Sequence, residues 1–140
     1  MFPALIEGSV PIVGSDVETL ARRLLEDLRT QGVIGSFEGN TISFLNDRNA
    51  TFQRWHFTRY QIVDRGEFTI GDGELRYRLY TALALVGYST LMLLPLAFCL
   101  ATQRLIGAVI VMAVWALIVG GSFFLAAFRN RRALERIVAT

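Results

Sequence analysis

Lysine is missing from this sequence, and cysteine and histidine each occur once among its 140 residues. All fourteen basic residues are arginine, a coding bias that indicates a GC-rich, bacterial genome. With Cys99 as the only cysteine, no disulfide can form within the chain. A zinc site needs several cysteine or histidine ligands at suitable spacing, and the chain does not supply them. We therefore expect neither a metal nor a cofactor.

Catalytic motifs are also missing. The lone histidine, His56, lies in an aromatic segment without a nucleophile motif around it. The short "GDGE" at 71–74 is not followed by a helix, so it predicts a turn and not a phosphate-binding loop. We expect no enzymatic activity. One alternative is a membrane-anchored enzyme that uses His56 with a nearby carboxylate.

Two long stretches lack charged residues altogether, residues 79–101 and residues 105–128. About 20 residues of helix cross the ~30 Å hydrocarbon core of a bilayer, so each stretch is long enough to span a membrane. Only Thr102, Gln103 and Arg104 separate them. One continuous helix would be far too long for a single crossing. The sequence therefore predicts a two-span hairpin with a tight turn at these three residues.

The arginines predict the orientation of this hairpin. Eight arginines flank the two spans on their domain side, whereas Arg104 stands alone in the turn; the eight are Arg59, Arg65, Arg76, Arg78, Arg129, Arg131, Arg132 and Arg136. Positively charged flanks stay in the cytoplasm. We expect an integral protein of the bacterial inner (plasma) membrane with both termini cytoplasmic. The start of the chain lacks a basic region, so we expect no cleavable signal peptide.

Two sets of residues in and around the hairpin are candidate functional residues. Ala116, Gly120 and Gly121 are small residues that let helix backbones approach closely. They could pack the hairpin on itself, or they could hold a second copy or another membrane protein. Arginines and tyrosines at the ends of the spans are candidates for the membrane interface: Arg76, Tyr77, Arg78, Tyr80, Arg104, Arg129, Arg131 and Arg132.

Residues 1–78 carry a formal charge of −2 and have the patterns of a small α+β domain. A helix is predicted between Gly14 and Gly32, with Ser15 and Glu18 as a capping box. Its apolar residues form one stripe: Val17, Leu20, Ala21, Leu24 and Leu28. Gly32 is expected to end it. The simplest fold for this pattern is one helix packed on one face of an antiparallel sheet.

The strands of that sheet are predicted from alternating apolar residues. We expect strands at 4–13, at 51–63, at 67–70 and at 74–80, and a hairpin over 33–45 that turns at Gly39–Asn40. Phe37, Ile42 and Phe44 are expected to face inward. The last strand leads into the first span without a linker.

The final segment, residues 129–140, follows the second span and is rich in arginine. We expect a basic cytoplasmic tail, either a plain flank or a short amphipathic helix on the anionic inner leaflet. The chain then divides into a cytoplasmic domain (1–78), a transmembrane hairpin (79–128) and this tail.

These features favour a non-enzymatic membrane protein whose domain and hairpin mediate protein–protein interaction, as an accessory subunit or by self-assembly. Its partners would be membrane lipid and either another protein or further copies of the chain. The negative charge of the domain argues against nucleic acid as a partner. A second alternative is an oligomeric channel or membrane-stress protein. The sequence does not choose the process or the partner.

Overall fold

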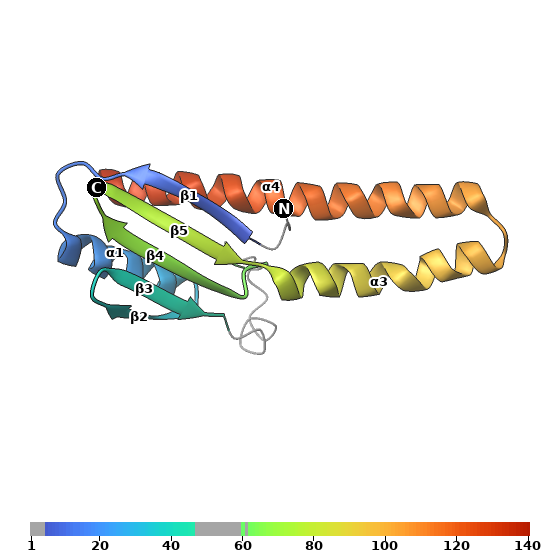
Figure 1. Cartoon of the computed structure of the whole chain (residues 1–140), viewed down its shortest axis with the longest axis horizontal. Coiled ribbons are helices and arrows are strands. Elements are labelled where there is room, and N and C mark those ends of the chain that lie inside the picture. The colour runs from blue at the N-terminus through green and yellow to red at the C-terminus, as the bar shows by residue number, and fades with distance from the viewer. Residues whose placement is uncertain (1–4, 47–59, 61) are drawn as a thin grey trace.

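The structure, a computed structural model, describes residues 5–46, 60 and 62–140. A five-stranded antiparallel sheet and helix α1 form one end of the molecule, and two long helices, α3 and α4, extend from it as a hairpin (Figure 1). The fold is α+β, as predicted. Among the described residues, two helices pack on the inner face of the sheet, and not the single helix that we expected.

The sheet has the strand order β1-β5-β4-β3-β2. The hairpin predicted over 33–45 is confirmed as β2 (Ile34–Glu38) and β3 (Thr41–Leu45). Strands β4 (Arg65–Gly71) and β5 (Glu74–Tyr80) form a second hairpin. Its two turn residues, Asp72 and Gly73, both have positive φ, as a type I′ turn requires. Strand β1 (Leu5–Pro11) pairs with β5 at one edge, where Pro11 needs no ladder donor.

The strand predicted at 51–63 falls mostly on residues outside those that the structure describes, His56 among them. Tyr60, Ile62 and Val63 are described, and they belong to a turn, so the expected strand does not reach them. Val63 donates its N–H to the carbonyl of Tyr60 at 2.9 Å, which closes this turn. Tyr60 is buried, and its ring lies edge-on to that of Phe44, with 5.2 Å between the centroids. The turn thus contributes an aromatic ring to the core without extending the sheet.

Helix α1 (Val17–Thr30) buries four of the five residues of the predicted stripe, with Leu20, Leu24 and Leu28 at 0–1% exposure and Ala21 at 2%. Val17, the first residue of the helix, is 38% exposed, so the prediction is wrong for that residue. Its C-terminus is confirmed at Gly32, whose φ is +78°. Gly32 donates its N–H to the carbonyl of Arg29, and Val33 donates to that of Leu28, a Schellman motif. The predicted capping box is wrong. The helix begins at Val17, one residue later than a Ser15 cap would require, so Asp16 occupies the N-cap position. Its side chain makes no cap hydrogen bond.

Helix α4 (Leu105–Ala139) is the second helix on the sheet. It continues without a break from the second apolar stretch through residues 129–139, and its C-terminal part packs on β1 and α1. Leu134 and Val138 are 1% and 4% exposed and belong to the same core cluster as Leu24 and Phe68. The segment expected to be a tail therefore forms part of the domain core.

Two glycines on the inner face of the sheet make room for aromatic rings. A Cβ at Gly8 would lie 2.5 Å from the hydroxyl oxygen of Tyr77, so the Tyr77 ring lies directly over the β1 backbone. A Cβ at Gly66 would lie 2.4 Å from Cζ of Phe44. Burial raises the pKa of the Tyr77 hydroxyl, an effect that the positive charge of Arg131 on α4 opposes and the negative charge of Glu135 reinforces. Tyr77 is a core residue between the sheet and α4.

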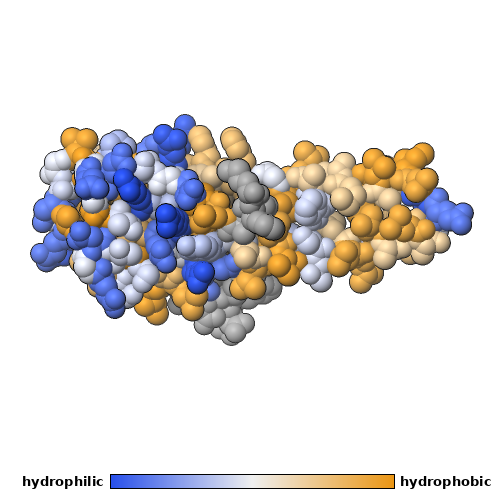
Figure 2. Space-filling model, viewed as in Figure 1, coloured by the Kyte–Doolittle hydropathy of each residue, from blue (hydrophilic) through white to orange (hydrophobic). Residues whose placement is uncertain are grey.

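The hairpin consists of α3 (Ala82–Ala101) and the first two thirds of α4, both long and apolar enough to cross a membrane. Leu79 and Tyr80 belong to β5, so α3 begins at Ala82, three residues later than the predicted span. The predicted turn is confirmed as another Schellman motif, with Gln103 at φ +55° and the N–H of Arg104 donating to the carbonyl of Cys99 at 2.9 Å. On the face that Figure 2 shows, most residues of the hairpin are hydrophobic, and hydrophilic residues return at its far end.

Candidate functional site at the junction of the sheet and the long helices

A chain of hydrogen bonds joins the sheet to the start of α3. Asn46 follows β3, and its Nδ2 donates to the carbonyls of Tyr60 and Val63, at 2.9 and 3.0 Å. The Asn46 N–H donates to the carbonyl of Asp64, and the Asp64 N–H donates to that of Tyr80, at 2.8 and 2.7 Å. Both side chains are buried, at 8% exposure. The turn before β4 is thereby held against the last residue of β5.

Asp64 also caps α3. Its Oδ2 accepts a hydrogen bond from the Leu83 N–H at 2.8 Å. The first N–H groups of a helix have no partner within the helix, and a carboxylate there also interacts favourably with the helix dipole. A residue 19 positions earlier in the chain thus fixes where the sheet ends and the apolar hairpin begins. Thr81, the single residue between β5 and α3, is fully buried.

Replacing Asp64 with alanine should destabilise the protein by about 1 kcal/mol, the usual effect of losing a helix cap. The amide of Leu83 should exchange its hydrogen faster, while amides in α1 keep their wild-type rates. Hydrogen exchange in detergent micelles measures both. Asp16→Ala is the matched control, because Asp16 holds the N-cap of α1 without a side-chain hydrogen bond. Equal effects of the two variants on hydrogen exchange at Leu83 would contradict the assignment of Asp64 as the cap of α3.

A small apolar cluster packs beside this network. Ile62 from the turn, Ala84 from α3 and Ala126 from α4 are buried together, with Tyr88 and Phe123 packed against them. One turn further along α4, Asn130 is 1% exposed. Its Nδ2 donates to the carbonyl of Ala126 at 2.9 Å, and its Oδ1 has no hydrogen-bond partner among residues 5–46, 60 and 62–140. Contacts from Asn46 after β3, from the turn, from α3 and from α4 therefore hold the junction together.

The face of α4 that packs within the chain is not the predicted small-residue face. Ala108, Val119 and Ala126 are buried, and they form one stripe that continues into Asn130 and Leu134. Ala116, Gly120 and Gly121 are exposed, and a Cβ at either glycine would meet no atom within 4 Å. The interpretation that these three residues pack the hairpin on itself does not match their positions. Contact with another helix remains a prediction.

The predicted interface residues fall into three groups. Arg76 and Arg78 lie on the outer face of β5, where they pair with Glu74 at 3.7 Å and Glu7 at 3.9 Å. Tyr77 points to the inner face, into the core. The others lie at the two ends of the apolar hairpin: Tyr80 is the last residue of β5, Arg104 is exposed in the turn, and Arg129, Arg131 and Arg132 are exposed on α4 just beyond its apolar part. The alternation of the predicted strand already separates Tyr77 from Arg76 and Arg78, because successive side chains of a strand point to opposite faces. Which of the two faces is buried is decided by the helices that pack on the sheet.

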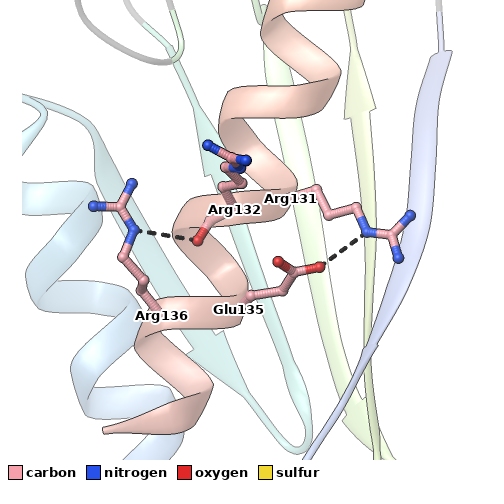
Figure 3. A network of polar contacts seen from close by, with 4 residues as sticks. All are labelled: Arg131, Arg132, Glu135 and Arg136. Carbon is pink, nitrogen blue, oxygen red and sulfur yellow. Dashed lines mark hydrogen bonds and ion pairs between the residues drawn. The ribbon is translucent and has the colours of Figure 1, made fainter.

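The exposed arginines near the end of α4 interact with their own helix. Figure 3 shows that Arg131 reaches Glu135, with 3.0 Å between Nε and Oε1, and that Arg136 donates to the backbone carbonyl of Arg132. The guanidinium of Arg132 lies over the Phe128 ring, 4.4 Å from its centroid. Among the described residues, no group of three or more His, Cys, Asp and Glu could hold a metal ion. The surface here is cationic and solvent-exposed.

Asn46, Asp64 and Asn130 are the junction residues that the sequence did not reveal. In the sequence, Asn46 and Asp64 have the ordinary character of turn residues. Asn130 is hidden among four arginines. A polar residue next to an apolar helix was the available signal for Asn130, but it does not indicate which side of the helix is buried.

The chain is thus a small two-layer α+β domain with a hairpin of two helices apolar enough to cross a membrane. No protein-family model and no curated protein matches the sequence. Among solved structures, it is weakly similar to the crystal structure of an uncharacterized conserved protein, DUF302, from Bacillus stearothermophilus. The TM-score is 0.32 at 8% sequence identity, over 86% of this chain and 98% of that one. Similarity this low carries no argument about function.

Proposed function

We propose that this chain is a non-enzymatic, two-span integral membrane protein whose hairpin and domain together mediate protein–protein interaction. One observation carries this proposal: α4 is a single helix whose first part belongs to the apolar hairpin and whose last part belongs to the core of the domain. A partner that binds either part would be coupled to the other through a rigid element. The partner is an accessory protein or a second copy.

The exposure of the hairpin supports a place in the bilayer. In the most apolar windows of α3 and α4, only 6% and 11% of the residues are buried. The core helix of a water-soluble protein would be mostly buried. Leu94 and Ile106 are 81% and 79% exposed, and such surfaces need lipid or protein around them.

The charges support an orientation with the domain and both termini in the cytoplasm of a bacterium. Exposed arginines gather at the domain end of the hairpin, whereas Arg104 is alone at the far end. In a Cys99→Ser background, Gln103→Cys should react with a membrane-impermeant maleimide added outside intact cells, and Glu38→Cys should not. The reverse pattern would refute this orientation.

The uncovered small-residue face of α4 supports interaction with another helix. Gly120 and Gly121 are exposed on the long helix with open space around them. Ala116 and Gly120 are four residues apart, and small residues at this spacing allow close helix packing in membranes. In this proposal, Ala116, Gly120 and Gly121 form the contact.

Cross-linking in intact membranes, followed by mild detergent extraction and mass spectrometry, tests the proposal. We expect either a stoichiometric foreign protein or a defined multiple of this chain. Gly121→Leu should reduce that cross-linked product strongly by enlarging the contact face. Gly87→Leu is the matched control, because Gly87 lies exposed on α3 with no atom near its Cβ position. If the wild type and both variants were recovered as monomers without partners, the proposal would be refuted.

A further inference from the structure

The outer face of the sheet carries an unusual row of side chains at the end nearest α3. The strand pairing aligns Ile34, Leu45, Arg65, Tyr80 and Leu5, one residue from each of the five strands. Ile34, Leu45 and Leu5 are 89%, 71% and 40% exposed. We call these five residues the proximal row. With strands about 4.8 Å apart, it extends about 19 Å across the sheet.

The next row on the same face has a different chemistry. It consists of Ser36, Ser43, Glu67, Arg78 and Glu7, all polar or charged. The hydroxyl oxygens of Ser36 and Ser43 lie 3.1 Å apart, and Arg78 pairs with Glu7. Two residues along a strand span about 6.7 Å, so the face changes from apolar to polar within that distance. Because apolar side chains occur at only one end of this face, their explanation must be specific to that end.

The connection to α3 fixes where the proximal row lies. Tyr80 is separated from Ala82, the first residue of α3, by Thr81 alone. All five strand ends that carry the row lie on the α3 side of the sheet (Figure 1). If α3 crosses the bilayer, as in the proposed function on which this inference rests, the row lies at the level of the lipid head groups.

The charges at this level are positive. The guanidinium of Arg65 lies over the Tyr80 ring, 4.5 Å from its centroid. Ala84 and Ala126 share one cluster, and a helix rises 1.5 Å per residue, so Arg129 and Arg132 on α4 lie within about a turn of the row's level. Among the described residues, the carboxylate nearest to Arg65 in the chain is that of Asp64, and it is turned inward, where it caps α3. Glu7 and Glu67 belong to the next row. Such a surface complements anionic lipid.

We propose that the proximal row is a lipid-contact surface that rests the domain on the head groups of an anionic bilayer. Ile34, Leu45 and Leu5 enter the interfacial region, Tyr80 lies at head-group level as aromatic residues do, and Arg65 meets the lipid phosphates. This contact holds the sheet at a defined height and tilt above the membrane. It also leaves the polar rows of the outer face open to the cytoplasm.

Depth-dependent quenching tests this inference with the full-length chain. In a Cys99→Ser background, an environment-sensitive fluorophore is attached at Leu45→Cys, Ser43→Cys or Thr41→Cys, three positions on the same face of β3. The protein is reconstituted in vesicles of phosphatidylcholine and phosphatidylglycerol that contain a head-group nitroxide lipid. Because Thr41 lies about 13 Å further along the strand, quenching should be at least about twofold stronger at Leu45, with Ser43 between. Ile34→Cys should match Leu45→Cys.

Two further arms make the result decisive. In vesicles of phosphatidylcholine alone, or with Arg65→Gln, quenching at Leu45 should fall because the attraction between Arg65 and anionic lipid is lost in both cases. A label at Leu94→Cys, with an acyl-chain nitroxide, reports whether α3 enters the bilayer. Absence of quenching at Leu94 would refute the proposed function. Quenching at Leu94 together with equal or absent quenching at the three β3 positions would refute this inference alone. A Leu45 label that is shielded from water but not quenched would also refute it, and would assign the row to contact with a second copy of the chain.

Discussion

Leu134→Asp is expected to unfold the α+β domain while α3 and the apolar part of α4 stay helical in a detergent micelle. Leu134 is 1% exposed and packs in the same core cluster as the α1 stripe and the inner face of the sheet. Removing a buried leucine side chain costs about 2–5 kcal/mol, and an unpaired buried carboxylate adds more. A domain of this size has about 5–15 kcal/mol of total stability, so the substitution removes most or all of it.

The measurement is a two-dimensional NMR spectrum of the protein in micelles, together with limited proteolysis. Signals of β3, β4 and β5 should collapse into the unfolded range, and the domain should become sensitive to protease. Arg136→Asp is the matched control, since it places the same side chain two residues further along on the exposed side of α4. A dispersed spectrum for Leu134→Asp would show that residues 129–139 are dispensable for the domain.

Gly66→Val is expected to lower the free energy of unfolding by about 3 kcal/mol, from overpacking of about 1–3 kcal/mol and the partial loss of aromatic contacts. The new Cβ would lie 2.4 Å from Cζ of Phe44 and 2.8 Å from Cδ2 of Leu79. The Phe44 ring cannot simply move aside, because it stacks on Phe68 at 5.5 Å and meets Tyr60 at 5.2 Å.

Urea unfolding in micelles, followed by tyrosine and tryptophan fluorescence, measures this change. Gly71→Val is the matched control on the same strand: a Cβ there meets nothing within 4 Å, and the backbone of Gly71 is not left-handed. Its stability should stay within about 0.5 kcal/mol of wild type, as expected for an unstrained surface substitution. Equal losses in the two variants would mean that β4 tolerates no valine anywhere, and that the Phe44 contact is not the cause.

The elements predicted correctly are those whose signal is local. The stripe of Leu20, Leu24 and Leu28 repeats with the helical period, and it is buried as expected. Residues 74–80 alternate apolar and polar, and they form β5 with the predicted bounds. Gln103 and Arg104 interrupt the apolar stretches, and they form the turn. In each case a short window of residues contains the whole pattern.

The predictions that failed concern segments with two possible environments. The arginines among residues 129–139 suggested a membrane flank, although Leu134 and Val138 lie four residues apart on one helix face. That spacing fits a core-facing helix as well as a surface one. The choice depends on whether a sheet lies nearby to cover the face. The capping box failed for a related reason, since Ser15 and Asp16 are both good caps and the adjoining chain selects between them.

The sequence by itself determined the apolar hairpin, its turn, the buried face of α1 and the last strand, because each rests on composition or period within one segment. Only the tertiary structure decided that α4 enters the core, that Asp64 caps α3 and that five strand ends align Ile34, Leu45, Arg65, Tyr80 and Leu5 in one row. These contacts join residues far apart in the chain. Their partners are selected by the strand order and register of the sheet, which no single segment contains.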